Sequence, residues 1–328
     1  MALKRKWVDI CISVILVTVL PCFLFSLIGD PDSEIPIEQE MPAVTTQELD
    51  AAEEICIDVL LKTGKVHSME LNDYLTSVVL CEMPATFETE ALKAQAVVAR
   101  TYTLRRKDGN KKHENAAVCT DPSCCQGFCA ESAYLSGGGT QEMLEKVRNA
   151  VITTSDEVLM YEGALIEATY FSCSGGQTED AKAVWGTDIP YLQSRESPGE
   201  ENATHYSDTV KFSVAEFKAQ LDIHTDKRPE QWVEHITYTN GGGVDTIRLC
   251  GREYKGTELR KKLDLRSTAF IITAIGDTVT ITTKGYGHRV GMSQYGADAM
   301  AVQGYNYAQI LSHYYPGTKL VSFHSDGD

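Results

Sequence analysis

The sequence is poor in positive charge. Its 328 residues include 30 Lys and Arg against 46 Asp and Glu, which gives a formal net charge of −16 at pH 7. A chain with this charge repels the phosphate backbone of nucleic acids, so nucleic acid is not the expected partner. An anionic membrane surface would repel it as well, and any attachment to a membrane therefore requires a hydrophobic segment.

Several common motifs are also missing. The chain has no internal repeat and no low-complexity tract. The glycine-rich segment 285–297 (GYGHRVGMSQYGA) does not keep the G-x-G-x-x-G spacing, because Val290 stands at the last glycine position. Ser172 and Ser174, in the segment 170–180 (YFSCSGGQTED), do not form a G-x-S-x-G nucleophile elbow. These absences leave no sign of an organic cofactor or of a serine nucleophile.

The N-terminal region contains one long hydrophobic run. Residues 10–28 carry no charge, and Lys4, Arg5 and Lys6 precede them. About 20 apolar residues span a bilayer, and basic residues before such a span place the N-terminus in the cytoplasm. We therefore expect residues 1–28 to be a cytoplasmic tip and a single-pass transmembrane helix, with the rest of the chain outside the cytoplasm. A cleaved signal peptide is the alternative.

The composition changes twice after this run. Residues 29–54 contain nine acidic residues, three prolines and no basic residue, a composition typical of a poorly ordered stalk. From residue 55 the chain alternates strand-like and helix-like segments without a regular βαβ order. We therefore expect residues 55–328 to form one catalytic domain of the α+β class.

Glu82 is the first candidate for chemistry, in the segment 81–102 (CEMPATFETEALKAQAVVARTY). A helix that begins with Asn72 as its N-cap would place Glu82 on the apolar face of residues 71–78, and Pro84 would end that helix. An apolar surrounding and the negative end of the helix dipole both raise the pKa of a carboxyl group. A protonated carboxyl group near neutral pH suits general acid catalysis. A solvent-exposed glutamate at a helix end is the alternative.

The next segment, 88–107, predicts an alanine-rich helix that is narrow enough for a neighbouring backbone to approach closely. Lys93 and Arg100 are seven residues apart and share one face of this helix. Both side chains could reach Glu82 in space.

The segment 109–139 is polar and rich in cysteine, and we expect it to be a loop. His113, Cys119, Cys124 and Cys125 lie within thirteen residues, and Cys129 follows closely. One imidazole and several thiolates suit a tetrahedral zinc ion, and a site filled by four protein ligands would be structural rather than catalytic. Disulfides in an exported loop are the alternative.

Two further segments have the composition of a cleft lining. The hydroxyl groups and the double glycine of 170–180 follow a predicted strand, which suits a loop that lines a cleft. In 285–297, four glycines surround His288, Ser293 and Gln294, whose side chains can hydrogen-bond to sugar hydroxyls. Ordinary turns are the alternative for each segment taken alone.

The order of these segments resembles a known family. EMPATF, EALKAQAVVARTY, CTDPSCCQ, YFSCSGGQTED, ELRKKLDLRSTAF and GYGHRVGMSQYGADAMA follow one another in the sequence. Together they resemble the SpoIID/LytB family over about residues 55–320. The uncharged N-terminal run and the acidic stalk fit the single-pass architecture of that family.

The resemblance implies a lytic transglycosylase that cleaves peptide-free peptidoglycan strands during spore engulfment, with the engulfing mother-cell membrane as its location. It implies that Glu82 is the catalytic acid and that Lys93 and Arg100 support the site or hold substrate. It places Tyr170, Ser172, His288, Ser293 and Gln294 in motifs that line the family's cleft.

The resemblance also bears on metal and partners. It implies one structural zinc ion held by His113, Cys119 and Cys125, with Cys124 at the fourth position and Cys129 as the alternative. It implies a partnership with the amidase SpoIIP, which removes stem peptides. A non-catalytic enhancer of a cell-wall amidase is a second reading of the chain, and a zinc-dependent hydrolase is a third.

Overall fold

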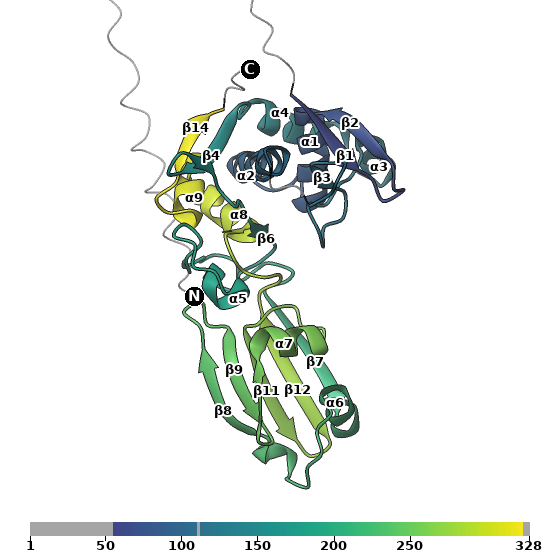
Figure 1. Cartoon of the computed structure of the whole chain (residues 1–328), viewed down its shortest axis with the longest axis vertical. Helices are drawn as coiled ribbons and strands as arrows, with labels where there is room; N and C mark the ends of the chain where they lie inside the picture. The colour runs from purple at the N-terminus through teal and green to yellow at the C-terminus, as the bar shows by residue number, and fades with distance from the viewer. Residues whose placement is uncertain (1–54, 110–111, 324–328) are drawn as a thin grey trace, which may run out of the picture. The chain divides into compact units, whose positions relative to one another are not determined.

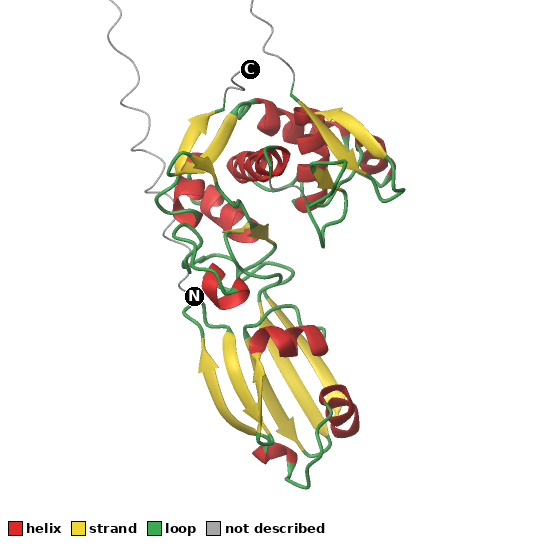
Figure 2. Cartoon of the chain, in the orientation of Figure 1, coloured by secondary structure: helices red, strands yellow, loops and turns green. Residues whose placement is uncertain are grey.

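The computed structural model describes residues 55–109 and 112–323. They form a mixture of helices and strands, as predicted (Figures 1 and 2). The predicted transmembrane run 10–28 and the stalk 29–54 lie outside the described residues. Within the described ranges, no helix is long and apolar enough to cross a membrane.

The first elements form a hairpin followed by two helices. Strand β1 (Cys56–Leu60) pairs antiparallel with β2 (Val66–Glu70) and parallel with the short β3 (Val118–Cys119). Helix α1 (Leu71–Glu82) follows β2 directly. Its N-cap is Glu70, whose carboxylate accepts a hydrogen bond from the Asp73 N–H, so the prediction of Asn72 as N-cap was wrong. The helix therefore starts two residues earlier than an Asn72 N-cap implies, because the Glu70 side chain is long enough to reach forward to the first turn.

Helix α1 ends as the proline predicts. Met83, which precedes Pro84, has extended backbone angles (φ −126°, ψ 141°), because the proline ring disfavours helical geometry in the residue before it. Glu82 is therefore the last helical residue of α1.

Helix α2 (Thr89–Lys107) is the centre of the first hydrophobic core, and Figure 1 shows it nearly end-on. Ala91, Ala94, Ala96 and Ala99 are all fully buried, and these small side chains let other elements pack closely around the helix. The surrounding elements are α1, α4 (Gln141–Ile152), β4 (Glu157–Tyr161), α8 (Gln294–Val302) and α9 (Tyr307–Tyr314).

Two small sheets complete this part of the molecule. Strand β4 lies between β5 (Ala164–Leu165) and β14 (Lys319–Ser322). Strand β6 (Tyr170–Phe171) pairs in parallel with β13 (Met292–Ser293), with Tyr170 opposite Met292. This pair of two-residue strands brings the segments 170–180 and 285–297 together.

A second hydrophobic core forms between residues 207 and 284. It is built from two three-stranded antiparallel sheets, in the strand orders β10-β9-β8 and β11-β12-β7, with the helices α6 and α7. The elements are β7 (Ser207–Ser213), α6 (Val214–Leu221), the 3-10 turn η1 (Pro229–Gln231), β8 (Val233–Tyr238), β9 (Val244–Leu249), β10 (Arg252–Lys255), α7 (Gly256–Lys262), β11 (Phe270–Ile275) and β12 (Thr278–Lys284). Phe217 and Trp232 stack at its centre, with their ring centroids 5.9 Å apart.

Some local predictions were wrong. The segment 109–139 contains the helix α3 (Glu131–Ser136) as well as β3, although it had been expected to be a loop. The strand expected before the glycines of 170–180 is broken into β5 and β6. The short helix α5 (Ala181–Trp185) and the strands β10 and β14 were not predicted. These elements have only two to six residues, too few for a periodic pattern to appear in the sequence.

Candidate active site

A cleft of about 900 Å³ contains Glu82 and residues from six other stretches of the chain. These stretches come from α1, α2, the cysteine-rich loop, the region around β6, α5, α7 and the glycine-rich segment before α8. The lining residues are Glu82, Tyr102, Lys112, Pro122, Ser123, Cys124, Cys125, Glu167, Ala168, Thr169, Tyr170, Phe171, Ser172, Trp185, Arg260, Tyr286, Gly287, His288 and Gln294.

The Glu82 carboxylate receives hydrogen bonds from distant segments. The backbone N–H of Gly127 donates to Oε1 at 2.5 Å, and the Gln294 side-chain amide lies 3.5 Å from Oε2. The Tyr170 hydroxyl adjoins the carboxylate and donates to Oε1 of Gln126 at 3.3 Å. The carboxylate is therefore held in one orientation at the wall of the cleft.

This surrounding raises the pKa of Glu82. Burial is the largest cause, and the hydrogen bonds from Gly127, Gln294 and Tyr170 offset only part of it. No cation contributes, so nothing nearby fixes Glu82 in its charged form. The predicted direction of the shift is confirmed, and desolvation carries it.

Aromatic rings form the wall beside Tyr170. The His288 ring lies 5.6 Å from the Phe171 ring and 5.3 Å from the Trp185 ring, measured between centroids. Burial, followed by the nearby Arg260, lowers the pKa of His288 to about 4, so the ring is neutral at neutral pH. Its Nδ1 accepts a hydrogen bond from the Val290 N–H, which leaves the ring proton on Nε2. Flat rings next to neutral polar groups suit the faces and hydroxyl groups of sugar rings.

Three of the predicted site residues do not line the cleft. Arg100 is 1% exposed, and its guanidinium donates to the carbonyls of Val151 and Thr154 at 3.0 and 2.7 Å. Lys93 donates to Glu90 at 2.8 Å and lies over the Tyr307 ring. The shared face of α2 is therefore turned toward α4 and α9, and neither cation lines the cleft, so of the two expected roles support of the site fits their positions better than contact with substrate.

Ser293 is the third. It is fully buried as the N-cap of α8, where its hydroxyl accepts a hydrogen bond from the Gly296 N–H. It thus holds the start of the helix that carries Gln294. Tyr170, Ser172, His288 and Gln294 all line the cleft together with Glu82.

The structure adds a carboxylate that the sequence did not suggest. Glu167 lines the same cleft, but its carboxylate is paired with Arg105, at 3.1 Å, and with Arg106. Two guanidinium groups therefore hold this carboxylate in place at the wall of the cleft. No sequence pattern marks Glu167, because it lies between two-residue strands.

The four predicted metal ligands come together. One ligand atom from each of His113, Cys119, Cys124 and Cys125 lies within 4.8 Å of all the others. The Nε2 atom of His113 is 3.6 Å from Sγ of Cys124 and 3.5 Å from Sγ of Cys125, and the two sulfur atoms are 3.9 Å apart. Zinc bonds of about 2.3 Å to sulfur and about 2.0 Å to nitrogen place neighbouring tetrahedral ligands about 3.5–3.8 Å apart, so the set fits such an ion.

The arrangement bears on two open alternatives. Cys124 belongs to the group of potential ligands, and Cys129 does not. None of the eight cysteines in the described part of the chain forms a disulfide. Burial and the neighbouring thiols raise the pKa of Cys119 to about 12, which disfavours a group of thiolates unless a cation balances their charge.

The cysteine-rich loop also reaches Glu82. Two residues after Cys125, Gly127 donates to the Glu82 carboxylate. Between them, the Gln126 side-chain amide donates to the hydroxyls of Tyr74 and Thr103 at 3.2 and 3.0 Å, and this amide is fully buried. The metal-ligand cluster and the hydrogen bond to Glu82 therefore share one rigid turn.

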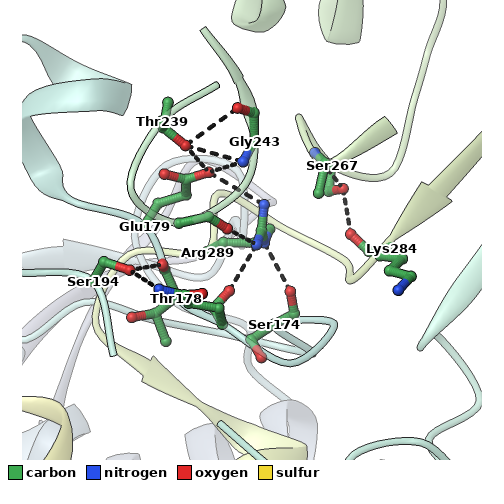
Figure 3. A network of polar contacts seen from close by, with 12 residues as sticks. Ser174, Thr178, Glu179, Ser194, Thr239, Gly243, Ser267, Lys284 and Arg289 are labelled. Atoms are coloured by element: carbon green, nitrogen blue, oxygen red, sulfur yellow. Dashed lines mark hydrogen bonds and ion pairs between the residues drawn. The ribbon is translucent and has the colours of Figure 1, made fainter. Parts of the chain in front are cut away.

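A buried ion pair holds the glycine-rich segment next to His288 (Figure 3). The guanidinium of Arg289 lies 3.2 Å from Glu179, and it donates to the carbonyls of Ser174 and Gly241 at 2.8 and 2.7 Å. Glu179 in turn accepts hydrogen bonds from Thr239 and Gly243, in the turn between β8 and β9. The network ties that turn to the two segments that meet at β6 and β13.

Comparison with known proteins gives one consistent result. A family model described as stage II sporulation protein matches residues 61–161. Stage II sporulation protein D of Bacillus subtilis (strain 168) is 36% identical over 323 residues, which cover 95% of this chain and 93% of that protein. The protein of the same name from Bacillus amyloliquefaciens is 40% identical over 260 residues, or 78% of this chain and 75% of that protein. A B. subtilis protein named amidase enhancer is 29% identical over 309 residues, covering 76% of this chain and 40% of that protein.

Proposed function

The chain belongs to the family of stage II sporulation protein D, and on this basis we propose that it is a peptidoglycan lytic transglycosylase acting on peptide-free glycan strands during spore engulfment. The observation that carries the proposal is the buried Glu82 carboxyl group, with a raised pKa, in a cleft walled by aromatic rings.

The reaction needs one group that first gives and then takes a proton. Protonated Glu82 donates its proton to the glycosidic oxygen between N-acetylmuramic acid and N-acetylglucosamine, and the bond from that oxygen to C1 breaks. The Glu82 carboxylate then accepts the proton of the muramic acid 6-hydroxyl, whose oxygen bonds to C1. This closes a 1,6-anhydro ring, consumes no water and returns Glu82 to its starting state.

The surroundings of Glu82 suit both steps. Burial favours the protonated form at the start, and the Gly127 N–H stabilises the carboxylate that remains after the first transfer. Glu167, which Arg105 and Arg106 hold in the same cleft, would face the positive charge developing on the sugar ring.

The metal cluster supports this chemistry indirectly. We assign it to one structural zinc ion held by His113, Cys119, Cys124 and Cys125, whose four ligand atoms leave no open position for a reacting water. When bound, the ion would crosslink the loop that presents Gly127 to Glu82.

The setting of the enzyme follows from the family and from the N-terminal sequence. We propose that residues 10–28 anchor the chain in the membrane and that residues 55–328 face the cell wall. SpoIIP, as the amidase that removes stem peptides, is the proposed partner. The relative named amidase enhancer makes a non-catalytic enhancer of such an amidase the second candidate function.

Product analysis tests the proposal. The purified full chain is mixed with peptide-free glycan strands, and the products are identified by mass spectrometry. Ends of 1,6-anhydromuramic acid, absent with Glu82→Gln and retained with Glu88→Gln, are the expected result. Glu88 is a matched control because it is an exposed glutamate six residues further along the chain, outside the cleft.

Two other results would replace the proposal. Hydrated reducing ends would indicate a hydrolase and would point to Glu167 as a second catalytic carboxylate. Strands that are bound but not cut, by wild type and Glu82→Gln alike, would leave the enhancer function.

A further inference from the structure

Arg260 places a guanidinium group in the cleft without a carboxylate partner. It belongs to α7, in the second hydrophobic core, and it lines the cleft beside Tyr286 and His288. Its Nε donates to the Leu265 carbonyl at 3.3 Å. Among the described residues Arg260 forms no ion pair with a carboxylate, and Tyr286 and His288 are its titratable neighbours in the cleft.

Other arginines near the cleft are paired. Arg105 and Arg106 contact Glu167, and Arg289 contacts Glu179. A half-buried guanidinium has lost part of its hydration, and without a partner this loss is not recovered. The protein is acidic and rich in carboxylates, yet Arg260 has no carboxylate partner among the described residues. Its position therefore suits an anion that the ligand supplies.

Arg260 also lies near the proposed reaction centre. Arg260, His288, Tyr170 and Glu82 all line the same cleft. A sugar chain seated with its scissile bond at Glu82 therefore runs past Arg260 in the same cleft.

We propose that Arg260 binds the lactyl carboxylate of a muramic acid from which the stem peptide has been removed. This inference rests on the proposed function, and it assigns Arg260 as the residue that selects peptide-free strands. In a peptide-bearing strand this carboxyl group is an amide, which is neutral and cannot form a bidentate ion pair with a guanidinium. N-acetylglucosamine has no carboxylate at all, so the charge marks each denuded muramic acid.

The test measures binding separately from cleavage. Full-length Glu82→Gln protein is titrated with three kinds of strand: peptide-free strands, peptide-free strands whose carboxylates are converted to carboxamides, and peptide-bearing strands. The same titrations are repeated with Arg260→Gln, Arg260→Lys, Lys112→Gln and Lys261→Gln added to the Glu82→Gln background. Lys261 is the matched control, because it is an exposed cation on the same helix that does not line the cleft.

The expected result is a loss of binding affinity that depends both on which residue is changed and on the charge of the strand. Arg260→Gln should weaken binding of peptide-free strands by about 10- to 100-fold, as expected for a lost charge-assisted bidentate contact. Binding of the carboxamide strands should already be weak and should not change further. The affinity of Arg260→Lys for peptide-free strands should lie between those of the parent and Arg260→Gln. The affinity of Lys261→Gln should stay within about twofold of the parent, as expected for an exposed charge.

Several outcomes would overturn the inference while leaving the proposed function intact. Equal binding of carboxylate and carboxamide strands by the parent protein would overturn it. This comparison needs no Arg260 variant, so it remains valid if the Arg260 variants do not fold. If Lys112→Gln weakens binding of peptide-free strands and Arg260→Gln does not, the carboxylate is bound by Lys112, the other cation of the cleft. A loss of binding to peptide-bearing strands in Arg260→Gln would mean that Arg260 binds peptide carboxylates instead.

The proposed function can fail separately. If the wild-type chain cuts no strand but binds carboxylate strands more tightly than carboxamide strands, the inference stands and the lytic activity is refuted.

Discussion

Gly127→Ala tests whether the cysteine-rich loop controls the acid. An added Cβ at this position would lie 2.8 Å from Sγ of Cys81 and 3.0 Å from Oε1 of Glu82. The φ angle of Gly127 is outside the left-handed region, so the backbone accepts alanine and the strain falls on those two side chains. Because the methyl group needs space that Glu82 occupies, the carboxylate must move away from the Gly127 N–H.

The size of the effect follows from the lost hydrogen bond. A hydrogen bond to a charged group contributes about 1.5–3 kcal/mol, and one pKa unit corresponds to about 1.4 kcal/mol. The Gly127 N–H stabilises the charged form of Glu82, so its loss should raise the pKa of Glu82 by about one to two units. Displacement of the acid should also lower the maximal kcat/KM, and about 100-fold, the loss typical of a 1 Å misplacement, is the upper bound for this smaller shift.

The assay is the pH dependence of cleavage of peptide-free strands by the full chain. Glu82 must be protonated to start the reaction, so kcat/KM falls as the pH rises through its pKa. In Gly127→Ala this fall should begin about one to two pH units higher. Gly137→Ala, at the C-cap of α3 with an ordinary φ of −81°, is the control and should behave like wild type. An unchanged pH profile in Gly127→Ala would refute the role given to this hydrogen bond, and so would an equal shift in the control.

Three other predictions concern stability and metal. Arg289→Met should lower the free energy of unfolding in urea by about 3–5 kcal/mol, since it leaves the fully buried Glu179 unpaired; a double variant with Glu179→Gln that recovers no stability would contradict this. Cys119→Ser should abolish stoichiometric zinc binding, measured by elemental analysis, and lower Tm; unchanged zinc content and Tm would rule out the metal assignment. Because the pKa of Glu82 is raised in the folded protein, the unfolded chain loses this proton at a lower pH than the folded protein does. The free energy of unfolding of the wild type should therefore fall as the pH rises from the unfolded to the folded pKa of Glu82. Glu82→Gln should lack that fall in urea titrations at a series of pH values, and a parallel fall in both proteins would contradict the assigned pKa direction.

The sequence by itself determined the local features of the site. The end of α1 at Glu82 follows from Pro84, whose ring excludes helical geometry in the preceding residue, and this effect needs no tertiary contact. The metal ligands from His113 to Cys125 are close in sequence, so their grouping in space was also predictable. The resemblance to the SpoIID/LytB family was confirmed because it rests on the order of such local segments.

The tertiary structure alone decided which distant groups meet. Lys93 and Arg100 share a helical face, but packing turns that face toward α4 and α9 and away from the cleft. Gly127 and Gln294 reach Glu82 from 45 and 212 residues away, and Arg260 arrives from a separate hydrophobic core. Local periodicity reports only which side of an element is apolar, whereas the partner of that side is set by how the elements pack. For this reason Glu82 could be singled out in the sequence, while the groups that surround it in the cleft required the fold.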